Sequence, residues 1–335
     1  MKDETRQILN ASELIAARQK HIERLERVYA GEAAEPPFVL NGILAAAEAD
    51  PYTEPERWVD ECLDFLAEHA DALPDNQVFS PLVVEFGPYG VHFIDKIFGA
   101  HVYESDGNWW NDPLETPIGE LVAPNLEADE TWQPAQRAAT AFVAAGLRSP
   151  FFGLPTLSSA LNIAINLYGE AFLAAMLAEP DAARRDLRTI NDLLCELHQW
   201  YRDTIPAEQL QPVVAAWRTQ PAGYGQLCGC SNQLLSPDQY AEFIAPLDDA
   251  LLSVYPNGGM MHLCGAHTQH IPTWRQMRSL RAVQLNDRAA DDFATYYREL
   301  RDDQVIYLNP TSTMTAKDAL DIAAGRRLVL VGEGE

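Results

Sequence analysis

Basic residues are scarce in this sequence of 335 amino acids, which has 24 lysines and arginines against 49 aspartates and glutamates. The resulting formal net charge of −25 repels the phosphates of nucleic acids and the surfaces of anionic membranes. We therefore expect a protein that binds neither nucleic acid nor membrane. The acidity identifies no partner, because it also serves solubility alone.

Long apolar runs are absent as well. No stretch approaches the roughly 18 residues of a membrane span, and the charged first residues, Met1-Lys2-Asp3-Glu4, differ from the apolar core of a secretory signal. The five cysteines are few and odd in number, which argues against a disulfide framework and for reduced thiols. These features predict a cytoplasmic protein.

Short apolar runs from residue 82 onward predict eight strands. They cover residues 82–86, 101–104, 150–154, 224–230, 259–264, 281–285, 305–308 and 328–331. Helical patterns lie between most of them, at 158–178, 181–203, 237–254, 268–279, 289–301 and 315–324. Strands that alternate with helices indicate parallel pairing through right-handed crossovers.

The absence of a Gly/Ser-rich linker between residues 81 and 335 favours one folded unit over two. We predict an α/β fold: a (β/α)8 TIM barrel at residues 79–335, with residues 1–78 forming an N-terminal helical extension packed on it. An open doubly wound sheet is the alternative. Its usual nucleotide signatures, G-x-G-x-x-G and the Walker-type loop, follow none of the predicted strands.

Two short segments carry paired metal ligands. In His262-Leu263-Cys264 the two zinc-type ligands stand at positions i and i+2, which in a strand point to the same face. Cys228-Gly229-Cys230 repeats this spacing upstream. Four such ligands suit a tetrahedral zinc site, and three with an open position suit a catalytic one. The alternative is that these cysteines pack as small hydrophobic residues.

Both pairs precede predicted helices. The first is followed by Ser236-Pro237-Asp238-Gln239, which combines an N-cap serine, a first-turn proline and a capping-box glutamine. The thiols are therefore expected at the carboxyl ends of two strands, the face of a (β/α)8 barrel where chemistry takes place. His267 and His270 begin the helix after the second pair, and we expect them to be capping or surface residues.

The order of several short motifs resembles the uroporphyrinogen decarboxylase-like superfamily over roughly residues 80–335. The motifs are Val84-Glu85-Phe86-Gly87, Phe98-Gly99-Ala100, Phe152-Gly153-Leu154-Pro155, Leu177-Ala178-Glu179-Pro180, Leu235-Ser236-Pro237-Asp238-Gln239-Tyr240 and His262-Leu263-Cys264-Gly265. Within the superfamily, the His-x-Cys-Gly element is similar to zinc-dependent corrinoid methyltransferases. These enzymes move a methyl group between a corrinoid cobalt and a thiol or another small acceptor.

The resemblance implies Zn²⁺ and a corrinoid (cobalamin) as cofactors, the corrinoid being carried by a partner protein. It also implies a small-molecule methyl donor or acceptor, and we name a homodimer as the candidate assembly. Of the polar residues near the expected rim, Glu85, Gln284 and Asn309 are assigned to the substrate pocket.

The chain departs from the superfamily in two places. The decarboxylases carry an Arg-Gln-Ala-Gly-Arg signature after the first strand. In this chain that place, at the end of the first predicted strand, reads Glu85-Phe86-Gly87-Pro88-Tyr89, and the carboxylate of Glu85 would repel a polycarboxylate substrate. Several methyltransferases have a third cysteine ligand after the last strand, where this chain has Glu333. Cys228 or Cys230 could replace that ligand as a thiolate, or Glu333 as an oxygen, and the softer thiolate is favoured.

Three functions are therefore open. A corrinoid-linked methyltransferase is favoured, a tetrapyrrole decarboxylase is the second candidate, and a non-catalytic barrel with a structural zinc is the third. A full set of three cysteines and one histidine would form a closed, structural site unless substrate displaces a ligand.

Overall fold

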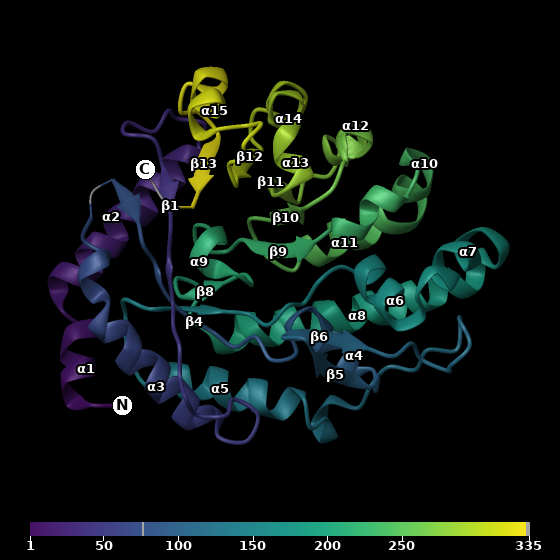
Figure 1. The fold of residues 1–335 in the computed structure, drawn as a ribbon, viewed down its shortest axis with the longest axis horizontal. Coiled ribbons are helices and arrows are strands. Elements are labelled where there is room, and N and C mark those ends of the chain that lie inside the picture. Colours follow the sequence, from purple (N-terminus) through teal and green to yellow (C-terminus); the bar gives the residue numbers. More distant parts are fainter. Residues whose placement is uncertain (76, 333–335) are drawn as a thin grey trace.

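Parallel strands form the centre of the computed structural model, which describes residues 1–75 and 77–332. Seven strands make one sheet in the order β3-β1-β13-β12-β11-β10-β9, and four make a second in the order β2-β4-β7-β8 (Figure 1). Their bounds are β1 Val39–Leu40, β2 Ile43–Leu44, β3 Val78–Phe79, β4 Leu82–Glu85, β7 Phe151–Gly153, β8 Leu210–Gln211, β9 Gly225–Cys228, β10 Gly259–Leu263, β11 Leu280–Leu285, β12 Val305–Leu308 and β13 Leu328–Val331. Every pairing within these two sheets is parallel.

Helices lie around the strands (Figure 1). The α-helices are α1 Asp3–Leu9, α2 Ser12–Tyr29, α3 Pro55–Glu68, α4 Phe93–Ile97, α5 Trp132–Ala144, α6 Ala160–Tyr168, α7 Glu170–Ala178, α8 Pro180–Thr204, α9 Ala215–Arg218, α10 Pro237–Gln239, α11 Ala245–Leu252, α12 Ile271–Trp274, α13 Arg288–Asp291, α14 Phe293–Glu299 and α15 Ala316–Ala323. The remaining helical turns are the 3₁₀ helices η1 Ala70–Ala72, η2 Gly90–His92, η3 Leu126–Ala128, η4 Cys230–Leu234 and η6 Thr268–His270, and the π-helical segment η5 Tyr240–Ile244. The predicted capping box at the start of α10 is confirmed, because Ser236 and Gln239 exchange side-chain and backbone hydrogen bonds.

The two sheets are joined along one side. β1 and β2 are successive parts of one extended segment, and so are β3 and β4. Where the strand pattern is interrupted, the Asn41 amide still donates to the Phe79 carbonyl at 2.9 Å, and the Ile43 amide donates to the Pro81 carbonyl at 2.8 Å. The backbone ladder therefore passes from one sheet to the other.

On the other side the ladder is open, because β8 and β9 do not pair within the described residues. Side chains bridge this gap. The Gln211 side chain exchanges two hydrogen bonds with the backbone of the buried Gln220, at 2.8 and 2.9 Å. The side-chain nitrogen of Gln220 donates to the Gly225 carbonyl at 2.9 Å. The fold is thus α/β with a parallel seven-stranded central sheet, and a closed barrel is not confirmed.

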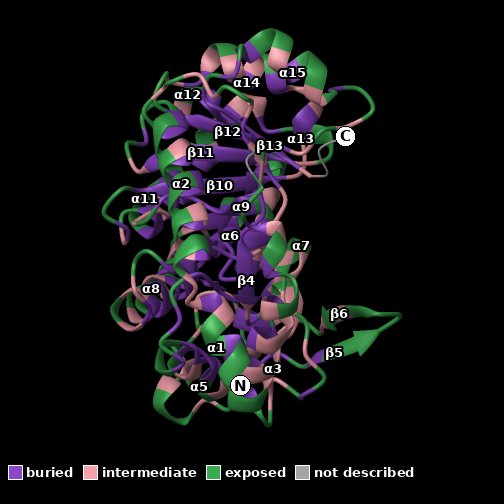
Figure 2. Ribbon diagram, turned by 90° about the vertical axis from the view of Figure 1, so that its left-hand side faces the viewer, coloured by how far each residue is buried: buried purple, intermediate pink, exposed green. Residues whose placement is uncertain are grey.

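Seven of the eight predicted strands lie in these sheets. The eighth, at 101–104, forms β5 (Val102–Ser105), which pairs antiparallel with β6 (Asn108–Asn111) in a hairpin that projects from the body (Figure 2). Its turn residues Asp106 and Gly107 have φ of 53° and 73°, as a two-residue type I′ hairpin turn requires. Strands β1, β2, β3 and β8 were not predicted from the sequence, because they are two residues long each and too short for a periodic pattern.

The first 78 residues pack against the sheets and also contribute to them. The His21 ring of α2 stacks on Phe79 of β3 at 4.8 Å, and the Arg18 guanidinium lies 4.2 Å from the centre of the Phe151 ring of β7. β1 and β2, which fall within residues 1–78, pair with β13 and β4. The domain boundary after residue 78 stays a prediction.

Within residues 1–75 and 77–332, no single helix has both the length and the apolar character needed to cross a membrane. The helices α6 and α7 meet the criterion only as a pair, across a bend of 111°.

The bridge between β8 and β9 can be tested by Gln211→Ala. This change leaves the buried backbone amide and carbonyl of Gln220 without partners, at about 1–3 kcal/mol each, so we expect the free energy of unfolding to fall by roughly 2–6 kcal/mol. Urea unfolding followed by circular dichroism measures it. Gln276→Ala, at an exposed glutamine, is the control and should change stability by less than about 0.5 kcal/mol. Equal effects of the two substitutions would show that the bridge contributes no stability.

Candidate metal centre

Two thiols and one imidazole converge beyond the carboxyl ends of β9 and β10. The Cys230 sulfur lies 3.4 Å from the Cys264 sulfur, and the Cys264 sulfur lies 3.1 Å from His262 Nε2. The three ligand atoms all lie within 4.8 Å of one another. His262 is buried, and both cysteines are partly exposed.

The pairing of the two strands brings these residues together. β9 and β10 run parallel with Cys228 opposite His262, and the Gly229 amide donates to the His262 carbonyl at 2.9 Å. β9 ends at Cys228, so Cys230 belongs to the turn η4 rather than to a strand. Cys264 directly follows the last residue of β10 and its sulfur stays on the side of His262 Nε2, whereas Cys230 is placed by its turn.

Hydrogen bonds at Nδ1 of His262, the ring nitrogen away from Cys264, determine the tautomer of the imidazole. The Gln284 amide nitrogen donates to Asn309 Oδ1, so its oxygen is turned to His262 Nδ1. Nδ1 must therefore carry the proton, and Nε2 presents a lone pair toward Cys264. An outer amide that fixes the tautomer in this way is a usual companion of metal-binding histidines.

The thiols are electrostatically unequal. The hydrogen bond from Cys230 lowers the pKa of Cys264, and the contact with His262 lowers it further. The pKa of Cys230 is raised, because its proton is held in that same bond and its surroundings are poorly solvated. Burial raises the pKa of Cys228. Of these three thiols, Cys264 is therefore the one whose pKa is lowered.

The other predicted ligands lie differently. Cys228 lines the cavity that opens beside the cluster, but its sulfur does not belong to the group of three ligand atoms. Glu333 lies outside the described residues. That any of these residues binds zinc stays a prediction.

The three residues assigned to the substrate pocket are not among the side chains that line this cavity. Gln284 and Asn309 form the hydrogen-bonded chain behind His262. Glu85 ends β4, and its carboxylate accepts from the Ala215 amide at 2.9 Å, while burial raises its pKa to about 7. Their roles toward a substrate stay predictions.

A cavity of about 300 Å³ opens beside the cluster. Its lining is mostly neutral: Val91, Thr156, Ser158, Asn162, Asn166, Val213, Val214, Arg218, Cys228, Cys230, Ser231, His262 and Cys264. Val91 is 56% exposed and marks the side open to solvent. The cavity is at the lower end of the range for small-molecule sites.

Arg218 is the one arginine in this lining, which contains no lysine. It was not identified as a site residue from the sequence. It is only 8% exposed, and its Nε has no hydrogen-bond partner. Within the part of the chain that the structure describes, no carboxylate forms an ion pair with it. With the Gln226 amide turned so that its oxygen faces the guanidinium, Arg218 Nη1 donates to that oxygen at 2.8 Å. Arg218 ends the four-residue helix α9, which leaves no periodic signal in the sequence.

The expectation for His267 and His270 was wrong, because both are fully buried. His270 donates from Nε2 to the Asn232 carbonyl at 2.8 Å. Burial lowers the pKa of His267 to about 4, which keeps its ring neutral. The short η6 and α12 turn these side chains inward, where a longer amphipathic helix would have exposed its first turn.

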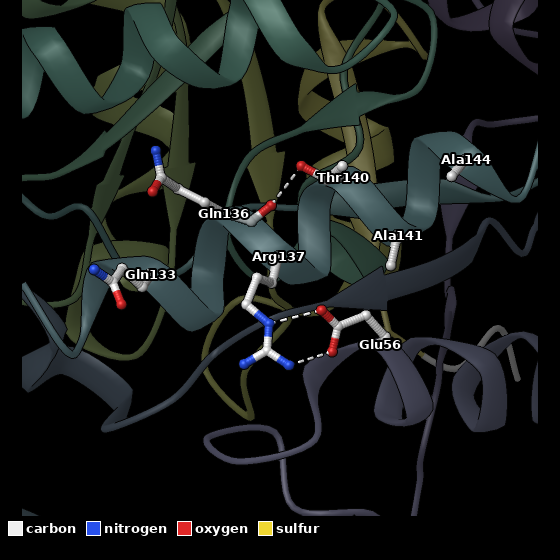
Figure 3. A pocket seen from close by; sticks show the side chains of 7 residues that line it. All are labelled: Glu56, Gln133, Gln136, Arg137, Thr140, Ala141 and Ala144. Carbon is white, nitrogen blue, oxygen red and sulfur yellow. Dashed lines mark hydrogen bonds and ion pairs between the residues drawn. The ribbon is translucent and has the colours of Figure 1, made fainter. Parts of the chain in front are cut away.

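A second, open pocket of about 500 Å³ lies between α3 and α5 (Figure 3). Its charged groups, Arg137 and Glu56, are joined by two hydrogen bonds of 2.6 Å. Since its lining has neither cysteine nor histidine, its chemistry differs from that of the cluster.

Comparisons with known proteins extend the description of the fold. No family model matches this chain, and no curated protein matches it. Among solved structures it is similar to a methyltransferase from Methanosarcina mazei, with a TM-score of 0.62 over 94% of this chain and 93% of that one. The two sequences are 13% identical, so the similarity shows a shared fold.

Matched substitutions separate the two candidate third ligands. Because only Cys230 lies within the cluster, we expect Cys230→Ala to weaken zinc binding by more than about 100-fold and Cys228→Ala to change it by less than about threefold. Competition with a chelating dye measures both affinities. The reverse order, or a comparable loss in Glu333→Gln, would assign the ligand elsewhere.

Proposed function

We propose that the protein is a zinc-dependent methyltransferase that moves a methyl group between a corrinoid and a small thiol. The convergence of Cys230, His262 and Cys264 at the wall of a small cavity carries this proposal. The fold shared with a methyltransferase supports it. We further propose that the two parallel sheets are the two arcs of a (β/α)8 barrel of the uroporphyrinogen decarboxylase-like type, opened between β8 and β9.

The donor set fits zinc. Thiolate and imidazole are the ligands that zinc prefers, and three protein ligands with one open position are typical of catalytic sites. The proton on His262 Nδ1 leaves Nε2 free to bind, and Cys264 is disposed to lose its proton. Bound there, zinc would stabilise the thiolate form of a substrate thiol near neutral pH.

The protein's own groups would do the remaining work. Gln284 and Asn309 hold the imidazole in one tautomer and one orientation. The cavity walls hold a small thiol beside the cluster and limit the access of water. A volume of about 300 Å³ does not enclose a corrin ring, so the corrinoid would meet the thiol at the open side near Val91, carried by a partner protein.

Arg218 supports a substrate that bears an anionic group. Zinc with two thiolates and one neutral imidazole would have no net charge, and the cavity lining has no carboxylate. The buried Glu85, outside this lining, is an acidic group that interacts electrostatically with the Arg218 guanidinium. A buried cation is costly unless it is paired and hydrogen-bonded. Because the Arg218 side chain lines the cavity, a carboxylate or sulfonate on the substrate could pair with its guanidinium.

One observation favours a structural zinc instead: Cys228 lies in the same wall and could close the site as a fourth ligand. Decarboxylation of a tetrapyrrole has less support. The first strand segment is β1–β2, so the place to seek the arginine signature is Ala45-Ala46-Ala47-Glu48 rather than the residues after β4. That segment also lacks arginine.

The function can be tested with methylcobalamin. In the reaction the thiol sulfur takes the methyl group, cobalt keeps the electron pair of the broken bond as cob(I)alamin, and the thiol proton is released. We expect zinc-loaded protein to catalyse it for a suitable thiol, and Cys264→Ala to fall to the uncatalysed rate, because a cluster ligand is lost. The change in cobalamin absorbance is the readout.

Cys195→Ala, which removes a thiol in α8, is the matched control and should retain activity. Corrinoid proteins should be included beside free methylcobalamin, since the free cofactor is a poor substitute for a protein-bound one. Loss of carbon dioxide from uroporphyrinogen by a protein that is silent in every methyl-transfer assay would favour the decarboxylase. Tightly bound zinc that no thiol reaches would favour the structural site.

The role of Arg218 gives a separate prediction. Arg218→Gln removes the charge, so we expect KM for thiols with an anionic group to rise by about 10- to 100-fold, the effect of one hydrogen bond to a charged group. KM for a neutral thiol of similar size should stay the same. Steady-state kinetics with such a thiol pair measures both, and equal changes would show that Arg218 does not bind the anion.

A further inference from the structure

The turn that carries Cys230 is held by buried polar groups. Asn232, two residues after Cys230 in η4, is completely buried. Its side-chain nitrogen lies 3.4 Å from an oxygen of Asp248 in α11 and 3.9 Å from the sulfur of Met261 in β10. Its backbone carbonyl accepts from His270 Nε2 at 2.8 Å. One residue thus ties the turn to three other elements.

Asp248, the carboxylate that accepts from the Asn232 side chain, is itself held in place. The Tyr240 hydroxyl donates to the same oxygen of Asp248 at 2.9 Å, and Trp274 Nε1 donates to the Tyr240 hydroxyl at 2.9 Å. All four side chains are buried. Because the Tyr240 hydroxyl holds this oxygen and is itself held by Trp274, Asp248 presents the oxygen to Asn232 in a defined direction.

Backbone packing also limits where the turn can lie. A Cβ on Gly229 would stand 2.8 Å from both the Asn232 amide nitrogen and the Met261 sulfur, so glycine allows the close approach of these groups. On the cavity side, the Ser231 amide donates to Asn162 Oδ1 at 3.0 Å. The residues on both sides of Cys230 therefore have fixed partners.

We propose that Asn232, Asp248 and His270 are positioning residues that hold the Cys230 sulfur against Cys264. The inference rests on the proposed function only in the use of Cys230 as a ligand. None of the three residues touches the cluster through its own side chain. They act by fixing the turn, so their loss should separate the two sulfurs whether or not a metal is bound.

The closeness of the two sulfurs can be measured without metal. In a glutathione redox buffer, the Cys230 and Cys264 thiols lose two electrons and two protons to form a disulfide, and one glutathione disulfide is reduced to two glutathiones. The equilibrium constant of this exchange reports the effective concentration of one thiol at the other. Peptide mapping by mass spectrometry of the full chain, stripped of metal, quantifies this particular disulfide.

Asn232→Ala should lower that equilibrium constant by about tenfold or more, since the turn loses its link to Asp248. His270→Leu, which removes the donor to the Asn232 carbonyl, should act in the same direction and serves if the first variant does not fold. Asn191→Ala is the matched control. Asn191 is also a buried asparagine, but it lies in α8, where its side-chain nitrogen donates to the Cys195 sulfur. It should change the constant by less than about twofold.

Equal effects of Asn191→Ala and Asn232→Ala, or no effect of Asn232→Ala and His270→Leu, would overturn the proposal. So would a wild-type protein that forms no disulfide between these two cysteines. A cobalt(II) titration of the wild type tests the proposed function separately. Failure to bind cobalt would sink the metal site, and the redox comparison would still decide whether the turn is positioned by Asn232.

Discussion

The candidate site depends on the parallel pairing of β9 with β10. This pairing sets Cys228 opposite His262, and the bond from the Gly229 amide to the His262 carbonyl extends it by one residue beyond β9. Where the strand ends, the chain turns into η4 and brings Cys230 to within 3.4 Å of Cys264. A shift of one residue in this register would move η4, and with it Cys230, relative to His262 and Cys264, which lie within β10 and directly after it.

The surroundings of the cluster combine two kinds of control. Behind it, amide groups of Gln284 and Asn309 fix the imidazole without adding charge. In front of it, Arg218 adds one positive charge to a cavity of otherwise neutral groups. With zinc bound as proposed, a neutral metal centre and a cation at the wall would together favour a small acid with a nucleophilic sulfur over a neutral or cationic substrate. The cavity lining itself has no carboxylate, although the chain as a whole is acidic.

Much of the fold could be predicted from the sequence, because most of its strands are buried apolar runs separated by amphipathic helices. The hairpin β5–β6 was misplaced in the predicted sheet, although its Asp106-Gly107 turn is a local hairpin signal. The pairing of His262 with Cys264 followed from strand periodicity. The choice of Cys230 over Cys228 did not, since it depends on the turn η4 and on Asn232, whose partners are distant in sequence. The role of Arg218 could not be predicted from the sequence for the same reason, because only the packed structure shows that it is buried in the wall of a cavity.

The central claim is that two thiolates and one imidazole hold zinc and leave one position for a substrate thiol. X-ray absorption at the zinc edge tests it most directly, on protein loaded with one equivalent of metal. The account predicts two sulfur ligands and one imidazole nitrogen from the protein, with an oxygen as the fourth ligand that is replaced by sulfur when an anionic thiol is added. A shell of three sulfurs and one nitrogen that does not change on adding thiol, or a protein that takes up no zinc, would contradict it.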